Sequence, residues 1–184
     1  MKCAYYGGSF NPLHNGHVGL AQWLLKNQPL GVQHVLVAPV VEHAFGKVLR
    51  PFEQRKAWLQ ECLPSSNASI IRATEPLTAD TIARLYTENP NYERIVVVLG
   101  SDILSELHKW DKWDVLTSLA DILIVGRVGS PIPKDCPYPL VQPEGIIGVS
   151  STELRGMVKA GRLEDVARLV PQCVCETLQQ EEGV

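Results

Sequence analysis

The chain has 184 residues, of which 45% are hydrophobic and 20% charged, a balance that fits one globular domain with a buried core. Its formal net charge of -3 at pH 7 argues against broad nucleic-acid binding, which needs a basic face, but allows a local basic pocket for a nucleotide. We expect a cytoplasmic protein with reduced thiols and no membrane contact, because the sequence shows no signal peptide, no membrane-spanning apolar run and no zinc-site spacing among its five cysteines.

The first predicted elements are a buried strand over residues 2–6 and a helix over residues 16–27, joined by the sequence GGSFNPLHNGH. A glycine-rich turn between strand and helix lets the backbone approach an anion closely, and the first helical turn points unpaired N–H groups at it. This arrangement predicts a cradle for the phosphates of a nucleotide. The predicted cradle residues are Gly8, Ser9, Phe10 and Gly16.

Two histidines stand at the start of this helix. His14 and His17 are three residues apart, so their imidazoles are expected on the same side of the first turn. Both would donate to phosphate oxygens, on which charge develops during phosphoryl or nucleotidyl transfer. The alternative is a glycine turn followed by two surface histidines, which explains the Gly-Gly pair but not all eleven residues of the sequence GGSFNPLHNGH.

The next predicted elements are a strand over residues 34–38, a helix over residues 51–63 and a strand over residues 69–72. The loop at residues 40–50 follows the carboxyl end of its strand, so it is expected on the same edge of a parallel sheet as the first loop. Thr78 is then predicted to cap a helix that continues to about Glu88.

A strongly apolar strand is predicted over residues 94–99, and it runs into Gly100-Ser101-Asp102. The Asp102 carboxylate could accept hydrogen bonds from ribose hydroxyls, cap a helix that starts at Ile103, or do both. The two tryptophans of the HKWDKW sequence that follows are either core anchors or a partly exposed stacking platform for a flat ring.

The last strand is predicted over residues 121–125, before Arg127, and a long surface loop with five prolines over residues 129–145. The SSTELR sequence at residues 150–155 then opens a helix. Hydroxyls, free backbone N–H groups and an arginine one turn later predict a second anion site. A capping box between the first serine and the glutamate would explain only those two residues. No chemistry is assigned to the helices over residues 162–180.

The sequences GGSFNPLHNGH, GSD and SSTELR, in this order, resemble the signature motifs of the HxGH nucleotidyltransferase superfamily. They are most similar to those of the nicotinate or nicotinamide mononucleotide adenylyltransferases of NAD synthesis, and the resemblance covers nearly the whole chain. It implies that Lys47 is the phosphate-binding lysine, with HAFGK in place of the common PHK, and that Trp110 stacks on the pyridine ring. Arg55 resembles an arginine that the family has at this point. The alternative is that Arg55 is a solvated side chain on the surface of its helix.

The resemblance implies adenylyl transfer, in which the 5′-phosphate of a pyridine mononucleotide attacks the α-phosphorus of ATP and pyrophosphate leaves. Mg²⁺ would bridge the phosphates and need few protein ligands, and catalysis would rest on positioning and charge stabilisation. The predicted catalytic residues are His14, His17, Lys47 and Arg155. The residues predicted to bind ATP are Gly8, Ser9, Phe10, Gly16, Gly100, Asp102, Ser151 and Thr152. The residues predicted to bind the mononucleotide are Thr78, Trp110 and Arg127.

The alternating strands and helices predict an α/β fold with a doubly wound parallel sheet, of the Rossmann-like nucleotidyltransferase kind. We expect one domain over residues 1–184, with a C-terminal helical part at residues 150–182 packed on the sheet. One alternative function is a transferase of the same superfamily that uses phosphopantetheine, whose signature usually has threonine in place of His14. Another is a nucleotide-binding sensor without catalysis, which would not require His14, His17 and Arg155 together.

The choice between an acid and an amide substrate depends on residues 76–81, PLTADT. They keep the T-x-D-T frame of the nicotinate-type enzymes but lack their tyrosine. A nicotinate carboxylate needs hydrogen-bond donors, which backbone N–H groups near Thr78 and around Trp110 could supply. We therefore predict a preference of about tenfold or more for nicotinate mononucleotide over its amide.

Overall fold

The structure is a computed structural model that describes residues 1–41, 48–127 and 129–182. Within these residues one parallel sheet has the strand order β3-β2-β1-β4-β5-β6. The strands are β1 (Cys3–Gly8), β2 (His34–Pro39), β3 (Ala68–Ile70), β4 (Ile95–Gly100), β5 (Ala120–Val125) and β6 (Leu140–Val141). The α-helices are α1 (Asn15–Asn27), α2 (Phe52–Cys62), α3 (Thr78–Glu88), α4 (Trp113–Leu119), α5 (Ser151–Lys159), α6 (Leu163–Ala167) and α7 (Gln172–Glu182), and the 3-10 helices are η1 (Pro29–Gly31) and η2 (Ser101–Lys109).

The inner strands β1, β2, β4 and β5 are buried on both faces because they are mainly apolar and successive side chains point to opposite sides of the sheet. In β2, for example, Val35 and Val37 join one apolar cluster while Leu36 and Ala38 join the other. The first cluster includes side chains of α1, α2 and the C-terminal helices, and the second includes side chains of α3, η2 and α4. The predicted doubly wound α/β sheet is therefore confirmed.

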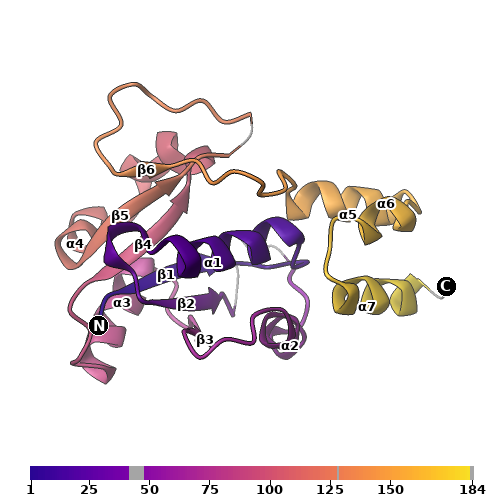
Figure 1. Cartoon of the computed structure of the whole chain (residues 1–184), viewed down its shortest axis with the longest axis horizontal. Coiled ribbons are helices and arrows are strands. Elements are labelled where there is room, and N and C mark those ends of the chain that lie inside the picture. Colours follow the sequence, from indigo (N-terminus) through magenta and orange to yellow (C-terminus); the bar gives the residue numbers. More distant parts are fainter. Residues whose placement is uncertain (42–47, 128, 183–184) are drawn as a thin grey trace.

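The C-terminal helices α5, α6 and α7 extend beyond one end of the sheet, at the right of Figure 1. Their buried residues Leu154, Val166 and Val174 belong to the same apolar cluster as the first face of the sheet. Trp58 of α2 donates its indole N–H to Thr177 of α7 at 3.2 Å, which ties this end of the chain to the sheet layer. In the described part of the chain, no helix has the length and apolarity needed to span a bilayer.

Three local predictions need correction. Thr78 is the first residue of α3 and not its N-cap, a position that Leu77 takes without a side-chain hydrogen bond. The helix expected from Ile103 is the 3-10 helix η2, which already begins at Ser101, so Asp102 lies inside its first turn and does not cap it. The proline-rich loop contains the short strand β6, which pairs with the edge of β5.

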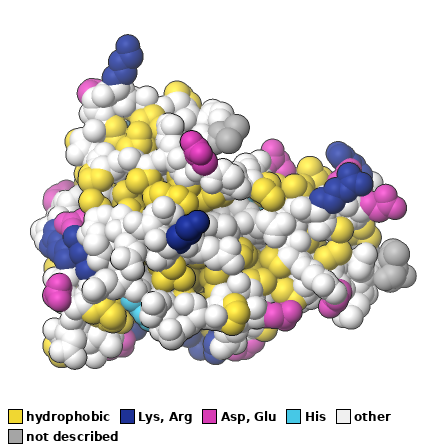
Figure 2. Space-filling view, in the orientation of Figure 1, with side chains coloured by type: hydrophobic (Ala, Val, Ile, Leu, Met, Phe, Trp, Pro, Cys, Tyr) yellow, Lys and Arg dark blue, Asp and Glu magenta, His cyan; other side chains and the backbone are white. Residues whose placement is uncertain are grey.

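Charged side chains on the face shown in Figure 2 stand in separate small groups, and most Lys and Arg side chains there lie beside Asp or Glu. Several ion pairs of exposed or half-buried side chains are present in the structure. Lys112 contacts Asp80 at 2.7 Å, Arg94 contacts Asp121 at 3.0 Å, and Arg162 contacts Asp165 at 2.6 Å. Exposed pairs of this kind contribute little to stability, which rests mainly on the two apolar clusters.

Candidate active site

The candidate site lies where the strand order of the sheet reverses. The chain passes from β1 outward to β2 and β3, and then returns to the other side of β1 with β4, β5 and β6. The loops at the carboxyl ends of β1 and β4 therefore diverge and leave a crevice, the usual ligand site of an open α/β sheet. The GGSFNPLHNGH loop, Gly100, Asp102 and Arg127 border this crevice.

Two adjoining cavities of about 410 and 450 Å³ occupy the crevice. The first, called the His14 compartment, is also lined by Gly16 and by residues 146–150. The second, called the Trp110 compartment, is also lined by Gly8, Ser9 and Thr78. A group that moves between ligands in the two compartments would pass the residues that both share. The shared lining residues are Tyr6, His17, Leu20, Asp102, Val125 and Arg127.

His14 and His17 hold each other and the start of α1. The backbone N–H of His17 donates to Nδ1 of His14 at 3.3 Å, and the backbone N–H of His14 donates to Nδ1 of His17 at 3.4 Å. This reciprocal capping box stacks the two rings, whose centroids are 3.5 Å apart. An imidazole that accepts at Nδ1 carries its proton at Nε2 when it is neutral. Each ring therefore carries an Nε2–H donor, and none of the described residues accepts a hydrogen bond from it.

The surroundings keep both imidazoles neutral at pH 7. Burial, together with the positive charge of Arg127 and against the pull of Glu153, lowers the pKa of His14 to about 4. Burial, followed by the neighbouring His14 and by Arg127, lowers the pKa of His17 well below its usual range. The pair therefore suits the role of neutral hydrogen-bond donor to phosphate oxygens, and positive charge at the site must come from other groups.

Phe10 supports the histidine pair from behind and lines neither cavity. Its ring is 1% exposed and packs edge-on against the ring of His17, with centroids 4.9 Å apart, and against Tyr6 at 5.5 Å. The backbone reaches this position through a φ of 46° at Phe10, which is unusual for a residue with a side chain. The Phe10 side chain therefore has a packing role, and the ATP contact expected of Phe10 stays a prediction.

Gly16 is required by a close backbone approach. A Cβ at this position would lie 2.6 Å from the carbonyl oxygen of Ile147 and 3.1 Å from Nδ1 of His14. Gly16 therefore brings residues 146–149 against the start of α1, where they form a wall of the His14 compartment. These residues were not predicted from the sequence to belong to the site, because an apolar run of this kind carries no signal for a ligand.

Asp102 and Arg127 form an ion pair at the ends of neighbouring strands. Arg127 Nη1 donates to Asp102 Oδ2 at 2.8 Å, and the Arg127 backbone N–H donates to the hydroxyl of Ser101 at 2.8 Å. Gly100 allows this, because a Cβ there would lie 2.2 Å from Asp102 Oδ1 and 3.0 Å from Arg127 Cδ. The sequence assigned the two residues to different ligands, whereas the structure places them together on the wall that both compartments share.

The second predicted anion site, at the start of α5, contacts the GGSFNPLHNGH loop, called the signature loop below. Ser150 and Glu153 form the expected capping box. Arg155 donates to the backbone carbonyl of Asn11 at 2.6 Å and to the hydroxyl of Thr152 at 2.9 Å, and Ser151 donates to the carbonyl of Pro12 at 3.0 Å. Ser151, Thr152 and Arg155 line neither cavity, although Ser150 and Glu153 line the His14 compartment.

Arg55 is buried, which excludes the solvated position that the sequence left open. Its guanidinium is fully covered and donates to the carbonyls of Ser9 and Val40, each at 2.8 Å, and of Arg50 at 2.9 Å. Burial lowers the pKa of Arg55 from its usual value. These contacts fix the signature loop against the segments that flank residues 42–47.

Thr78 and Trp110 line the Trp110 compartment together, as the mononucleotide assignment requires. Trp110 is partly exposed and packs edge-on against Trp113, with ring centroids 6.0 Å apart. Glu75 and Pro76 also line this compartment. Pro76 belongs to the PLTADT sequence considered for the acid or amide choice, whereas Glu75 was not singled out from the sequence. Lys47 lies outside the described residues. Within the described part of the chain, no three His, Cys, Asp or Glu side chains are grouped as metal ligands.

Comparison with known proteins agrees with this geometry. The family model described as cytidylyltransferase-like matches residues 5–157. Two proteins named "Probable nicotinate-nucleotide adenylyltransferase", from Anaeromyxobacter dehalogenans strains 2CP-1 and 2CP-C, are 36% and 37% identical to this chain, over 98% of it and 95% of their own length. A protein of the same name from Myxococcus xanthus is 32% identical over 93% of this chain and 88% of its own. The chain belongs to the nicotinate-nucleotide adenylyltransferase family.

Solved structures extend the family relationship to the fold. The structure of Plasmodium falciparum nicotinic acid mononucleotide adenylyltransferase complexed with NaAD superimposes with a TM-score of 0.82, at 20% identity and over 100% of this chain and 96% of that one. The resemblance to this adenylyltransferase family and the Rossmann-like nucleotidyltransferase fold, both predicted from the motifs, are confirmed. The family membership also makes this chain a nucleotidyltransferase, so the two-compartment crevice is its candidate active site.

Proposed function

We propose that the chain transfers the adenylyl group of MgATP to nicotinate mononucleotide, giving deamido-NAD and pyrophosphate in NAD biosynthesis. The observation that carries this proposal is the position of His17 on the wall shared by two compartments, at the helix terminus of the family signature. An enzyme that transfers a phosphoryl-linked group between two ligands needs such a junction. A protein that only binds one nucleotide would not need it.

The chemistry needs no protein nucleophile. A 5′-phosphate oxygen of the mononucleotide forms a bond to the α-phosphorus of ATP, and the bond from that phosphorus to the β-phosphate oxygen breaks as pyrophosphate leaves. No proton has to move in this exchange. Catalysis then consists of holding the reactants in line and stabilising the charge that develops on the non-bridging oxygens.

His14 and His17 are assigned to the phosphates of ATP. Both Nδ1 atoms accept backbone N–H groups, and within the described residues neither Nε2–H has an acceptor, so each ring can donate to an α- or β-phosphate oxygen without carrying charge. Positive charge is assigned to Arg127, to Lys47 of the loop after β2, and to the Mg²⁺ ion that arrives with ATP as part of the substrate. Arg155 holds the backbone of Asn11 and is assigned the triphosphate with its remaining donors.

ATP is assigned to the His14 compartment, which Gly16 lines. Ser151 and Thr152 stay predicted ATP contacts, although they line neither compartment and lie in the first turn of α5 beside Ser150 and Glu153 of the compartment wall. Asp102 of the shared wall is assigned to the adenosine ribose, whose hydroxyls a carboxylate accepts well. Gly8, Ser9 and Gly100, which the sequence predicts as ATP contacts, line the Trp110 compartment, and we assign them to the phosphates where the two ligands meet.

The mononucleotide is assigned to the Trp110 compartment. Trp110 offers a partly exposed indole for stacking on the pyridine, and the first turn of α3 at Thr78 offers backbone N–H groups for its carboxylate. We keep the expected preference of about tenfold or more for the acid over the amide.

We also propose one domain over residues 1–184 and a cytoplasmic location, which the shared apolar cluster and the use of ATP support.

The direct test is to incubate the purified chain with MgATP and one acceptor at a time, and to identify products by mass while measuring pyrophosphate. Nicotinate mononucleotide should give deamido-NAD and one pyrophosphate for each product molecule. Turnover with phosphopantetheine but with neither mononucleotide would show that the chain has a different activity of the superfamily. Nucleotide binding without any pyrophosphate release would favour the sensor instead.

A further inference from the structure

A carboxylate lies on the wall of the compartment assigned to the pyridine. Glu75 lines the Trp110 compartment together with Pro76 and Thr78, and its side chain is 20% exposed. An acidic residue is unexpected beside a site for a negatively charged nicotinate, because like charges repel in a partly buried cleft. An amide substrate, in contrast, would gain a hydrogen-bond acceptor from it.

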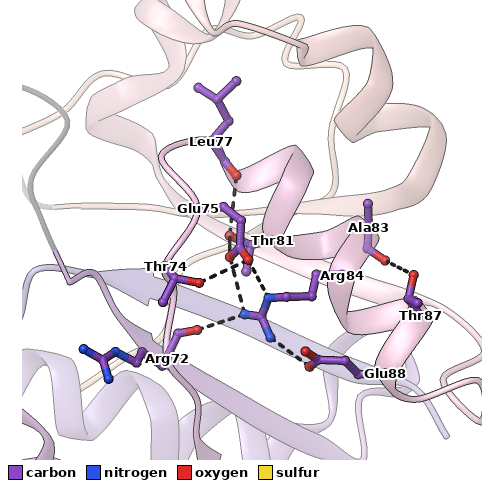
Figure 3. Close-up of polar contacts among 9 residues, drawn as sticks. All are labelled: Arg72, Thr74, Glu75, Leu77, Thr81, Ala83, Arg84, Thr87 and Glu88. Carbon is purple, nitrogen blue, oxygen red and sulfur yellow. Dashed lines mark hydrogen bonds and ion pairs between the residues drawn. The ribbon is translucent and has the colours of Figure 1, made fainter.

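The structure shows that Glu75 is fully occupied by residues of its own chain (Figure 3). Its Oε1 accepts from Arg84 Nε at 2.6 Å and from the Thr74 hydroxyl at 3.1 Å. Its Oε2 accepts from the Thr81 hydroxyl at 3.1 Å and from Arg84 Nη2 at 3.4 Å. A carboxylate has about four acceptor positions, so none remains for a ligand amide.

Arg84 is held in place from two further sides. Its Nη1 donates to Glu88 at 2.8 Å and its Nη2 donates to the carbonyl of Arg72 at 2.9 Å. Burial alone would raise the pKa of Glu75, but hydrogen bonds from Arg84 and the charge of Arg84 lower it to about 2. The carboxylate is therefore ionised at neutral pH, and the adjacent guanidinium compensates its charge.

The other charged side chains of the Trp110 compartment also compensate each other. Among its described lining residues these are Asp102 and Arg127, which form the ion pair of the shared wall. The charge of the compartment is then close to balanced as long as Arg84 stays on Glu75. Removal of the Arg84 guanidinium would leave one uncompensated negative charge and two open acceptor positions beside the pyridine.

We propose that the Glu75–Arg84 pair determines the discrimination between an acid and an amide at the pyridine of the substrate. This inference rests on the proposed function, because it needs a pyridine mononucleotide in the Trp110 compartment. By masking Glu75, Arg84 makes the pocket acceptable to a carboxylate and denies the amide an acceptor. The two residues are specificity-determining and take no part in the transfer of the adenylyl group.

The experiment measures kcat/KM for nicotinate and nicotinamide mononucleotide, at saturating MgATP, in four proteins: wild type, Arg84→Met, Glu75→Gln and the double variant. A unit charge in a partly exposed cleft changes affinity by roughly tenfold. Arg84→Met should therefore lower the acid-to-amide ratio by about tenfold, mainly through the KM for the acid. Glu75→Gln should raise this ratio by about threefold or more, and the double variant should return it to within about threefold of wild type.

Two controls separate charge from structure. Glu88→Gln removes the other partner of Arg84 but leaves Glu75 paired, so the ratio should stay at the wild-type value. The KM for MgATP should be unchanged in all variants. If Arg84→Met does not fold, the isosteric Glu75→Gln decides alone through the direction of its effect.

Equal losses for both mononucleotides in Arg84→Met and Glu75→Gln would show that the pair only anchors the loop, and would overturn the inference while leaving the proposed function intact. Absence of any dinucleotide product from the wild-type protein would instead refute the proposed function itself. The two failures are thus distinguishable in one set of assays.

Discussion

Replacement of Gly16 by alanine tests whether the close approach between α1 and residues 146–149 builds the His14 compartment. The new Cβ would lie 2.6 Å from the carbonyl oxygen of Ile147, well inside van der Waals contact. This neighbour is backbone and cannot rotate away, and its oxygen already accepts the N–H of Val149 at 3.0 Å. The contact must be relieved by a shift of the whole segment.

Overpacking of this kind costs about 1–3 kcal/mol, and the helix propensity of alanine over glycine returns at most about 1 kcal/mol. We therefore expect Gly16→Ala to lower the free energy of unfolding by about 1–2 kcal/mol. Gly19 of the same helix is a matched control, because its Cβ would meet only Ile146 Cγ1 at 3.8 Å. Gly19→Ala should leave the protein equally stable or about 0.5–1 kcal/mol more stable.

Urea unfolding at neutral pH measures the stabilities, and the KM for MgATP reports on the compartment. Gly16→Ala should raise this KM severalfold because residues 146–149 line the ATP site, whereas Gly19→Ala should leave it unchanged. A Gly16→Ala protein with wild-type stability and wild-type KM would refute the argument that the glycine is needed for this contact.

Two further predictions concern buried groups. Arg55→Met should lower the free energy of unfolding by about 2–4 kcal/mol, because it leaves the carbonyls of Ser9, Val40 and Arg50 without their donor. The control Lys56→Met, on the surface of the same helix, should change it by less than about 0.5 kcal/mol. Equal effects of the two substitutions in urea unfolding would contradict the burial of Arg55. His14 has a folded-state pKa of about 4, below the 6.5 of an unfolded chain, so acidification favours the unfolded state, which binds the proton first. Between about pH 7.5 and about pH 5 the free energy of unfolding should fall by about 2 kcal/mol because of His14, and His14→Gln should lack this part of the pH dependence. The same pH dependence of the free energy of unfolding in both proteins would contradict the lowered pKa of His14.

The sequence was sufficient to predict the sheet and the histidine pair, for physical reasons. Strands such as β2 and β4 are apolar on both faces, a pattern that few other structures can bury. His14 and His17 are close in sequence and start a helix, so their proximity follows from helix geometry alone. Their mutual capping, which fixes the Nε2–H form, depends on ring orientations that no spacing reveals.

The parts that the sequence did not predict depend on contacts between distant segments. Arg55 looks like any charged residue on a helix, because its three carbonyl partners come from loops that the sheet brings together. Asp102 and Arg127 meet only because β4 and β5 are neighbours. Strand β6 is too short, and Leu140 too exposed, to produce a pattern among the prolines.

The most direct test of the account is the turnover of His17→Ala with MgATP and nicotinate mononucleotide, because the central claim assigns the Nε2–H of His17 to the transferred phosphate. Removal of one such donor should lower kcat by roughly 100- to 1000-fold, about 2.7–4 kcal/mol, with both KM values within about threefold of wild type. The lost cap should cost only about 1 kcal/mol of stability, so the variant should remain folded. A kcat within about threefold of wild type in folded His17→Ala would contradict the claim.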